Sequence, residues 1–246
     1  EIADTISTIP LARKMEDCPK VLIVGEIYVR RDDFAVDELI QHFSRHGIVG
    51  KVSNVAEWFY YCDFVRHYEL KKKLNLLPWY RRVFAQEFRD LIDWRIEHIY
   101  KKHVERKVRG TLSATGLVPH TPHDMKEIMK NTEKHFVGLD LYSEISISSG
   151  VAATAMMDGF SGIVNISPFA CLIGRVIEGL YTPWARERKY PTISIEIDGN
   201  LLPPNVLSKL EIFMLNVKRF KGKDDIQTMV ERHGSKAATI DRKIVR

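Results

Sequence analysis

The chain has 246 residues, of which 45% are hydrophobic, and it carries a formal net charge of +5 at neutral pH. This length and apolar content support a packed core in one large domain or two small ones, and they argue against extensive disorder. No apolar run is long enough to cross a bilayer, and the first residues lack the basic-then-apolar pattern of a secretory signal. Three widely separated cysteines do not form a disulfide framework, so we expect a cytoplasmic protein without a membrane partner.

The first predicted elements form a βαβ unit that follows an N-terminal arm, residues 1–19. Residues 21–25 are a continuous run rich in Val and Ile, of the kind that is buried on both faces of a parallel sheet. A helix is predicted over residues 34–46, and Gly47 supplies its C-cap. A second strand over residues 48–55 completes the unit, for which parallel pairing and a right-handed crossover are the default.

The next segment, residues 56–110, combines aromatic side chains at helical spacing with a basic composition. Between Arg66 and Arg109 there are thirteen Lys and Arg against six Asp and Glu. We predict an inserted helical subdomain that is broken at Leu77-Pro78. Its basic surface is either a solvated helical face or a contact for a phosphate-bearing partner such as coenzyme A. Nucleic acid is not expected, because no zinc-finger or RNA-binding signature is present.

The rest of the chain alternates helices with short apolar strands. The predicted elements are helices over residues 121–135, 143–158, 172–189 and 203–220 and strands over residues 162–166 and 191–198. A small-residue run after Gly150 permits a close backbone approach to a neighbouring element. We therefore predict an α/β core over residues 20–55 and 111–221, followed by a polar tail or linker over residues 222–246.

Cys171 lies between a predicted strand and a predicted helix. In open α/β sheets, ligands collect beyond the carboxyl ends of the strands, and the helix that starts near residue 172 points its positive dipole to the same place. A dipole of this sign favours thiolate, which is the form that binds metals or attacks electrophiles. From these features alone, Cys171 is either a metal ligand or an inert loop residue.

Four other polar residues are candidate substrate-binding groups. Glu26 directly follows the first strand and Asp198 ends the last one, so both lie where ligands of α/β sheets collect. Each has an ordinary alternative, because Glu26 can cap a neighbouring helix and Asp198 can form a turn with the residues after it. Ser148 and Ser149 either donate hydrogen bonds to a ligand or pack within their helix.

Several familiar catalytic motifs are missing from the sequence. It contains no glycine-rich phosphate loop, no dinucleotide-binding fingerprint, no nucleophile elbow and no paired histidines at zinc spacing. Nucleotide hydrolysis by a phosphate loop and hydrolysis by an activated serine are therefore unsupported.

A set of short motifs occurs in one order between about residue 20 and residue 221. They are Val24-Gly-Glu-Ile-Tyr-Val-Arg30 with Phe34-Ala35, Glu57-Trp58, Gly150-Val-Ala, Gly162-Ile-Val-Asn-Ile-Ser-Pro-Phe-Ala-Cys171, Glu178-Gly179, Pro191-Thr-Ile-Ser-Ile-Glu-Ile-Asp-Gly199 and Leu210-Glu-Ile-Phe213. This ordered set resembles the dehydratase-like portion of the 2-hydroxyacyl-CoA dehydratase and CoA-substrate-specific activase superfamily. The resemblance implies flavodoxin-like or Rossmann-like α/β units with an inserted helical subdomain.

The resemblance also implies a chemistry. It implies a cysteine-ligated iron–sulfur cluster of the 4Fe–4S type, which passes low-potential electrons to an acyl-CoA or related substrate and is reduced by a separate ATP-dependent, actin-like activase module. One-electron reduction of a thioester makes its unacidic β-proton removable, which dehydration of a 2-hydroxyacyl-CoA requires. In this interpretation Cys171, in its Pro-Phe-x-Cys context, ligates the metal, and the basic segment holds the phosphates of CoA.

The cysteine count departs from that pattern. A 4Fe–4S cluster is usually held by four thiolates, whereas Cys18 precedes the first strand and Cys62 lies in an aromatic helix, where we expect a buried small side chain. The other ligands are therefore expected from another domain, subunit or small molecule, and a sequence that begins at Glu1 without Met fits a piece of a longer protein. The alternative is a non-catalytic α/β interaction or scaffold domain of a larger assembly, without a competent cluster.

Overall fold

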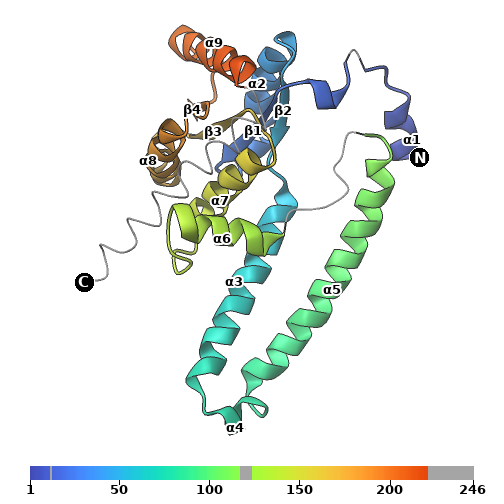
Figure 1. The fold of residues 1–246 in the computed structure, drawn as a ribbon, viewed down its shortest axis with the longest axis vertical. Helices are drawn as coiled ribbons and strands as arrows, with labels where there is room; N and C mark the ends of the chain where they lie inside the picture. Colours follow the sequence, from blue (N-terminus) through green and yellow to red (C-terminus); the bar gives the residue numbers. More distant parts are fainter. Residues whose placement is uncertain (12, 117–123, 221–246) are drawn as a thin grey trace. The chain divides into compact units, whose positions relative to one another are not determined.

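The computed structural model describes residues 1–11, 13–116 and 124–220 (Figure 1). The strands are β1 (Lys20–Gly25), β2 (Val49–Val52), β3 (Gly162–Pro168) and β4 (Thr192–Ile197). The helices are α1 (Ile2–Ser7), α2 (Asp33–Arg45), α3 (Val55–Leu76), α4 (Trp79–Arg82), α5 (Gln86–Ser113), α6 (Met125–His135), α7 (Glu144–Met157), α8 (Leu172–Glu187) and α9 (Pro204–Arg219), with 3-10 turns η1 (Met15–Asp17) and η2 (Val29–Arg31).

The chain divides into two compact units. Unit 1 contains Glu1–Asp17 and Asn54–Glu127, and unit 2 contains Cys18–Ser53 and the chain from Ile128 onward. The predicted insertion over residues 56–110 falls inside unit 1. Unit 1 is larger than this predicted segment, because it also includes α1 and the end of α5. The predicted tail over residues 222–246 and the predicted helix start at residue 121 lie outside the described residues.

Unit 2 is built on a parallel sheet with the strand order β2-β1-β3-β4 in the described part of the chain. All three strand pairs are parallel, as the continuous apolar runs predicted. The chain adds β2 on one side of β1 and then β3 and β4 on the other side, so the strand order reverses between β1 and β3. This is the order of flavodoxin-like folds, and the predicted α/β fold class is confirmed.

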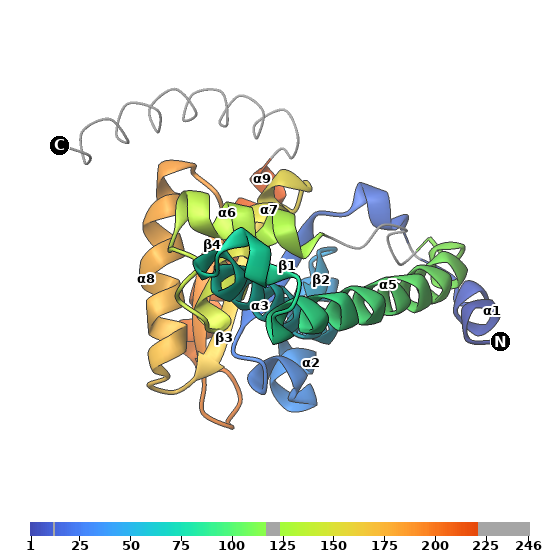
Figure 2. The same cartoon turned by 90° about the horizontal axis from the view of Figure 1, so that it is seen from below.

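Helices cover both faces of this sheet. On one face, α2 and α9 pack against inward side chains of β1, β3 and β4, and the rings of Phe43 and Phe213 lie 6.3 Å apart between their centroids. The buried residues of this core are Val21, Ile23, Val29, Leu39, Phe43, Ile48, Val164, Ile166, Ile195, Leu202, Leu210, Phe213, Met214 and Val217. On the other face, α7 packs against β1 and α8, and α8 lies along β3 and β4 (Figure 2). Unit 2 thus has three layers.

The packing of α6 against α7 depends on Gly150, the residue just before the run of small residues that the sequence predicted to allow close approach. Ser143 caps α7 by accepting a hydrogen bond from the Ile145 N–H at 3.2 Å. A Cβ atom added at Gly150 would lie 2.2 Å from Thr132 Oγ1 and 2.5 Å from the carbonyl oxygen of Ile128. The hydroxyl of Thr132 donates to the carbonyl oxygen of Ser146 at 2.7 Å, which ties the two helices together.

In unit 1, α3 and α5 form a helical hairpin that is broken at Leu77 and Pro78, as predicted. Polar contacts hold the two helices together. The Trp94 Nε1–H donates to the carbonyl oxygen of Asp63 at 2.9 Å, and the ammonium group of Lys101 donates to both Asp63 carboxylate oxygens at 2.9 Å. The Trp94 ring also stacks between two histidine rings, those of His67 and His98.

The side chain of Cys62 is exposed on α3, so the expectation of a buried cysteine is wrong. Its neighbours Tyr61 and Asp63 are the buried residues of this turn, which leaves Cys62 on the outer side of the helix. Within the described residues, no helix is both long and apolar enough to cross a membrane.

We predict that Gly150→Ala lowers the free energy of unfolding by about 2 kcal/mol, because the added methyl group overpacks the contact between α6 and α7. The matched control is Gly179→Ala in α8, where an added Cβ meets no atom within 4 Å. That change should raise stability by up to about 1 kcal/mol through helix propensity. Urea unfolding measures both, and an equal effect of the two substitutions would contradict the packing explanation.

Candidate functional site

The candidate site lies at the carboxyl edge of the sheet, where β1 and β3 end side by side. Ligands of doubly wound α/β folds bind beyond this edge, at the pair of strands where the order reverses. The Glu26 N–H donates to the carbonyl oxygen of Ile166 at 3.0 Å, so the chain after β1 is held against β3. The topology therefore assigns the site to the loops that follow these two strands and to the helix that starts beside them.

Gly25 shapes this edge. Its φ angle is +120°, a conformation that side chains with a Cβ rarely adopt. An added Cβ would lie 2.0 Å from the carbonyl oxygen of Ile166 and 2.8 Å from Asn165 Oδ1. Glycine is therefore required for the chain to turn from β1 into the loop that carries Glu26.

Two carboxylates and a guanidinium group gather where β1 ends. The carboxylate of Glu26 accepts a hydrogen bond from the Val29 N–H at 2.8 Å, and that of Glu144 accepts one from the Ile27 N–H at 3.0 Å. Both Glu144 and Arg30 are buried. Of these three residues, Glu26 was predicted from the sequence, and its hydrogen bond to the first N–H of η2 also fits the alternative that it caps a neighbouring turn.

Burial raises the pKa of the Glu144 carboxyl group above its ordinary value. The hydrogen bond from Ile27 lowers this pKa, the negative charge of Glu26 raises it, and the positive charge of Arg30 lowers it. The upward effect of burial is the largest of these. A partly desolvated carboxyl group with a raised pKa, beside a second acid at a switch point, is typical of a functional site.

The two predicted serines of α7 have different surroundings. Ser149 Oγ donates to the carbonyl oxygen of Ile145 at 2.6 Å, so its hydroxyl is engaged within the helix. Ser148 lies one turn after Glu144 and thus on the same side of α7. It is 3% exposed, and its hydroxyl oxygen has no hydrogen-bond partner within the described part of the chain. Ser148 is therefore the better placed of the two to bind a ligand.

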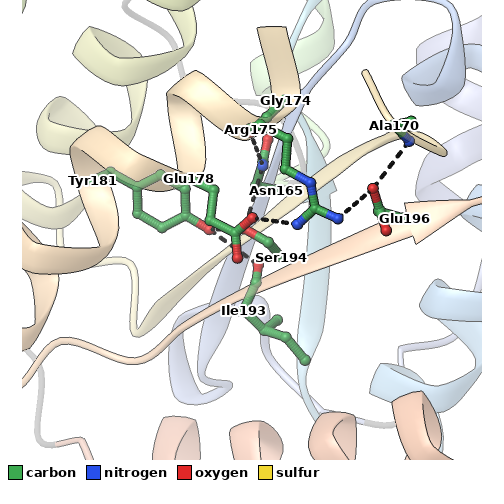
Figure 3. Close-up of polar contacts among 9 residues, drawn as sticks. All are labelled: Asn165, Ala170, Gly174, Arg175, Glu178, Tyr181, Ile193, Ser194 and Glu196. Atoms are coloured by element: carbon green, nitrogen blue, oxygen red, sulfur yellow. Dashed lines mark hydrogen bonds and ion pairs between the residues drawn. The ribbon is translucent and has the colours of Figure 1, made fainter. Parts of the chain in front are cut away.

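Cys171 is the N-cap residue of α8 and is partly exposed, so it lies between strand and helix as predicted. The loop that carries Cys171 is held in place by a residue of β4, Glu196 (Figure 3). A carboxylate oxygen of Glu196 accepts from the Ala170 N–H at 3.1 Å and from the Arg175 guanidinium at 2.5 Å. Arg175 also pairs with Glu178 at 2.9 Å. Glu196 thus connects the backbone before Cys171 to the first turn of α8.

Asn165 lies in the middle of β3 and joins this strand to its neighbours (Figure 3). Its Nδ2 group donates to the carbonyl oxygen of Gly174 and to Ser194 Oγ, each at 3.3 Å. Tyr181 extends the network, because its hydroxyl lies 3.0 Å from Ser194 Oγ. Asn165 is 1% exposed, and its Oδ1 atom has no hydrogen-bond partner among the residues described. A buried acceptor therefore lies next to Gly25.

Asp198 and Cys18 make no contact with these groups in the described structure, and Cys62 belongs to the other unit. Asp198 is exposed and accepts a hydrogen bond from the Asn200 N–H at 3.0 Å, which lowers its pKa and forms the turn that the sequence suggested as the alternative. Cys18 precedes β1 at the amino edge of the sheet, about 20 Å of strand away from the carboxyl edge. Cys62 belongs to unit 1.

Across residues 1–11, 13–116 and 124–220, no three His, Cys, Asp or Glu side chains are close enough together to hold a metal ion. The donors present therefore fit a cluster only in part, since the carboxyl edge offers a single thiol, that of Cys171. What the edge does offer is two carboxylates, a guanidinium, one unengaged hydroxyl and this thiol. Groups of these kinds can bind a polar ligand by hydrogen bonds, and a thiol is a soft metal ligand.

No protein-family model, curated protein or solved structure matches this chain. Glu144, Asn165 and Glu196 were not predicted from the sequence. One signal was present for Asn165, which is a single polar residue in an otherwise apolar strand core. No comparable signal marked the two glutamates, whose partners lie far away in the sequence.

We predict that the stability difference between wild type and Glu144→Gln depends on pH. A carboxyl group whose pKa is raised by folding stabilises the protein below its unfolded pKa, and this contribution is lost as the pH rises through the folded pKa. The free energy of unfolding of wild type should therefore fall relative to the variant between acidic and neutral pH, by about 1.4 kcal/mol for each unit of pKa difference. Urea unfolding across this range measures it. A difference that varies with pH no more than that of the exposed control Glu211→Gln would contradict the expectation.

We predict that Glu196→Ala increases the reactivity of Cys171 several-fold, because the loop loses its hydrogen bond to β4 and opens more often. The measurement is the rate of alkylation by iodoacetamide in a Cys18→Ser, Cys62→Ser background. Glu178→Ala is the matched control, since it also removes a carboxylate from Arg175 but leaves the contact to Ala170 intact. Equal rates in the two variants would show that the Glu196 contact does not restrain the loop.

Proposed function

We propose that this chain is a dehydratase-like or activase-associated domain that takes part in iron–sulfur electron transfer to an acyl-CoA or related substrate. The observation that carries the proposal is the position of Cys171 at the N-cap of α8, on a loop that Glu196 holds at the carboxyl edge of the sheet. Thiolates are the usual protein ligands of iron–sulfur clusters, and this edge is where such folds bind their ligands.

In this proposal the chain supplies one ligand, the Cys171 thiolate, to a cluster of the 4Fe–4S type. A bound cluster provides low-potential electrons. The remaining ligands come from another domain, subunit or small molecule, because Cys171 is the one thiol that unit 2 places at this edge and Cys18 lies at the amino edge of the same sheet. The contribution of Glu196 and Arg175 is to keep the thiol-bearing loop in one position.

The polar groups where β1 ends are proposed to bind the substrate. Ser148 has a buried hydroxyl available for a hydrogen bond, Glu144 supplies a carboxylate one turn earlier on α7, and Glu26 supplies one on the loop after β1. Ser149 and Asp198 already make local hydrogen bonds, so we assign them to the helix and to the turn. The proposed partners are an ATP-dependent, actin-like activase module or another subunit, in the reducing cytoplasm where thiols persist.

A second candidate is a non-catalytic α/β interaction or scaffold domain of a larger assembly. The observation that favours it is the lack of a metal-binding group of three or more donors among the described residues. In that case the buried carboxylate of Glu144 would serve the fold, through its hydrogen bond to the loop after β1.

Anaerobic reconstitution with iron, sulfide and a small thiol distinguishes the two. We expect wild type, Cys18→Ser and Cys62→Ser to take up iron and to show the absorption and EPR spectra of a cluster, and Cys171→Ser to lose both. A cluster that survives in Cys171→Ser would exclude this residue as a ligand. No cluster in any of the four proteins would mean that the small thiol does not replace ligands that a partner supplies, or that the chain is the interaction domain.

A further inference from the structure

The end of the α3–α5 hairpin exposes large apolar side chains. We call residues 70–86 the hairpin tip; they comprise the end of α3, the short helix α4 and the start of α5 (Figure 1). Five large apolar side chains of the tip are between 56% and 83% exposed: those of Leu76, Trp79, Tyr80, Val83 and Phe84. Apolar side chains that are gathered this closely and exposed this far are uncommon on soluble proteins and mark interaction sites.

The hairpin tip is also strongly basic. Its charged residues are Lys71, Lys72, Lys73, Arg81 and Arg82, and the nearest acidic residues, Glu69 and Glu87, lie outside it on either side. The side chains of the three lysines and of Arg81 are exposed. The tip therefore joins a positive charge to an apolar surface, with no negative charge of its own.

The tip is ordered by its own residues. The guanidinium group of Arg82 donates to the carbonyl oxygen of Leu77 at 3.0 Å and to that of Asn75 at 3.3 Å, which closes the turn around Pro78. The rings of Trp79 and Tyr80 meet edge to face with 6.0 Å between their centroids. Because these contacts fix the turn, the exposed apolar groups are presented on a folded surface rather than on a loose chain.

We propose that the hairpin tip binds the surface of an anionic lipid bilayer. Trp and Tyr are the residues enriched at membrane interfaces, and Lys and Arg are attracted to anionic lipid headgroups. A second copy of the tip is a poor partner, because the two basic surfaces would repel each other. Nucleic acid would pair with the positive charge but would leave Leu76, Val83 and Phe84 without an apolar environment.

The expected absence of a membrane partner rested on the lack of a segment that spans a bilayer. Surface binding needs no such segment, because apolar side chains at a turn enter only the region of the headgroups and the upper acyl chains. The tip belongs to unit 1, and Cys171 and the carboxyl edge belong to unit 2. The membrane proposal therefore stands independently of the proposed iron–sulfur function.

The test is co-sedimentation of the full chain with phosphatidylcholine vesicles and with phosphatidylcholine/phosphatidylserine vesicles. We expect binding to the anionic vesicles alone, weakened by added salt. Removing one Lys near an anionic surface lowers the partition coefficient about fivefold, so the triple variant Lys71→Gln/Lys72→Gln/Lys73→Gln should lower it by about a hundredfold. Trp79→Ser/Phe84→Ser should lower it by at least about tenfold.

Two matched controls separate the tip from general effects of charge and hydrophobicity. Ile96→Ser/Tyr100→Ser removes two exposed apolar side chains, 63% and 70% accessible, from the middle of α5, and Lys209→Gln/Lys218→Gln/Arg219→Gln removes three positive charges from α9. Both should bind nearly as well as wild type. Trp79→Phe should keep the binding but lose the vesicle-induced blue shift of tryptophan fluorescence.

Three results would overturn the proposal. The first is no sedimentation with anionic vesicles at low salt. The second is an equal loss of binding in the tip variants and the controls. The third is binding to an oligonucleotide, dependent on the three lysines, in a protein that does not bind the anionic vesicles; this would assign the basic surface to nucleic acid instead.

Discussion

The carboxyl edge of unit 2 depends on the approach of two backbones at Gly25. Where β1 ends, its chain comes so near to β3 that a single Cβ would overlap the carbonyl oxygen of Ile166. The same approach lets the Glu26 N–H donate to that oxygen, which continues the pairing one residue beyond the strand. The positions of the residues that follow on the loop after β1, including Arg30, depend on the turn that Gly25 permits. A larger residue at position 25 would move the whole edge rather than one side chain.

Burying Glu144 beside this turn opposes stability, and the local structure offsets only part of that cost. Its carboxylate gains the Ile27 N–H as a donor, which satisfies a backbone group that the turn leaves unpaired. Desolvation nevertheless outweighs the hydrogen bond in its effect on the pKa. Ser148 and Asn165 add buried oxygen atoms without hydrogen-bond partners in the described structure. Apolar side chains could be buried here without this desolvation cost, so the concentration of polar groups is the feature of this edge that a structural role alone does not explain.

The sequence predicted those features that local patterns determine. Continuous apolar runs predicted β1 and β3, the Ser143 cap fits the start of α7, and the strand-to-helix junction located Cys171. It did not predict pairs that form only when distant segments meet. Ile27 and Glu144 are 117 residues apart, and Ala170 and Glu196 are 26 apart, so neither glutamate is distinguishable from a surface charge in the sequence. The prediction that Cys62 is buried was wrong for a related reason. Both sides of α3 carry aromatic residues, so the composition does not show which side faces α5.

The hairpin of unit 1 shows how a fold can leave apolar residues available for another partner. Its two helices are held by the ion pair of Lys101 with Asp63 and by the stacked Trp94 ring, all well away from the turn. Toward the turn, Leu70 and Leu74 are the buried residues of α3, whereas Trp79 and Phe84 are exposed. The exposed side chains therefore contribute little to the stability of the hairpin. What distinguishes them from the exposed apolar residues in the middle of α5, such as Ile96 and Tyr100, is that they lie at the turn of the hairpin among basic side chains.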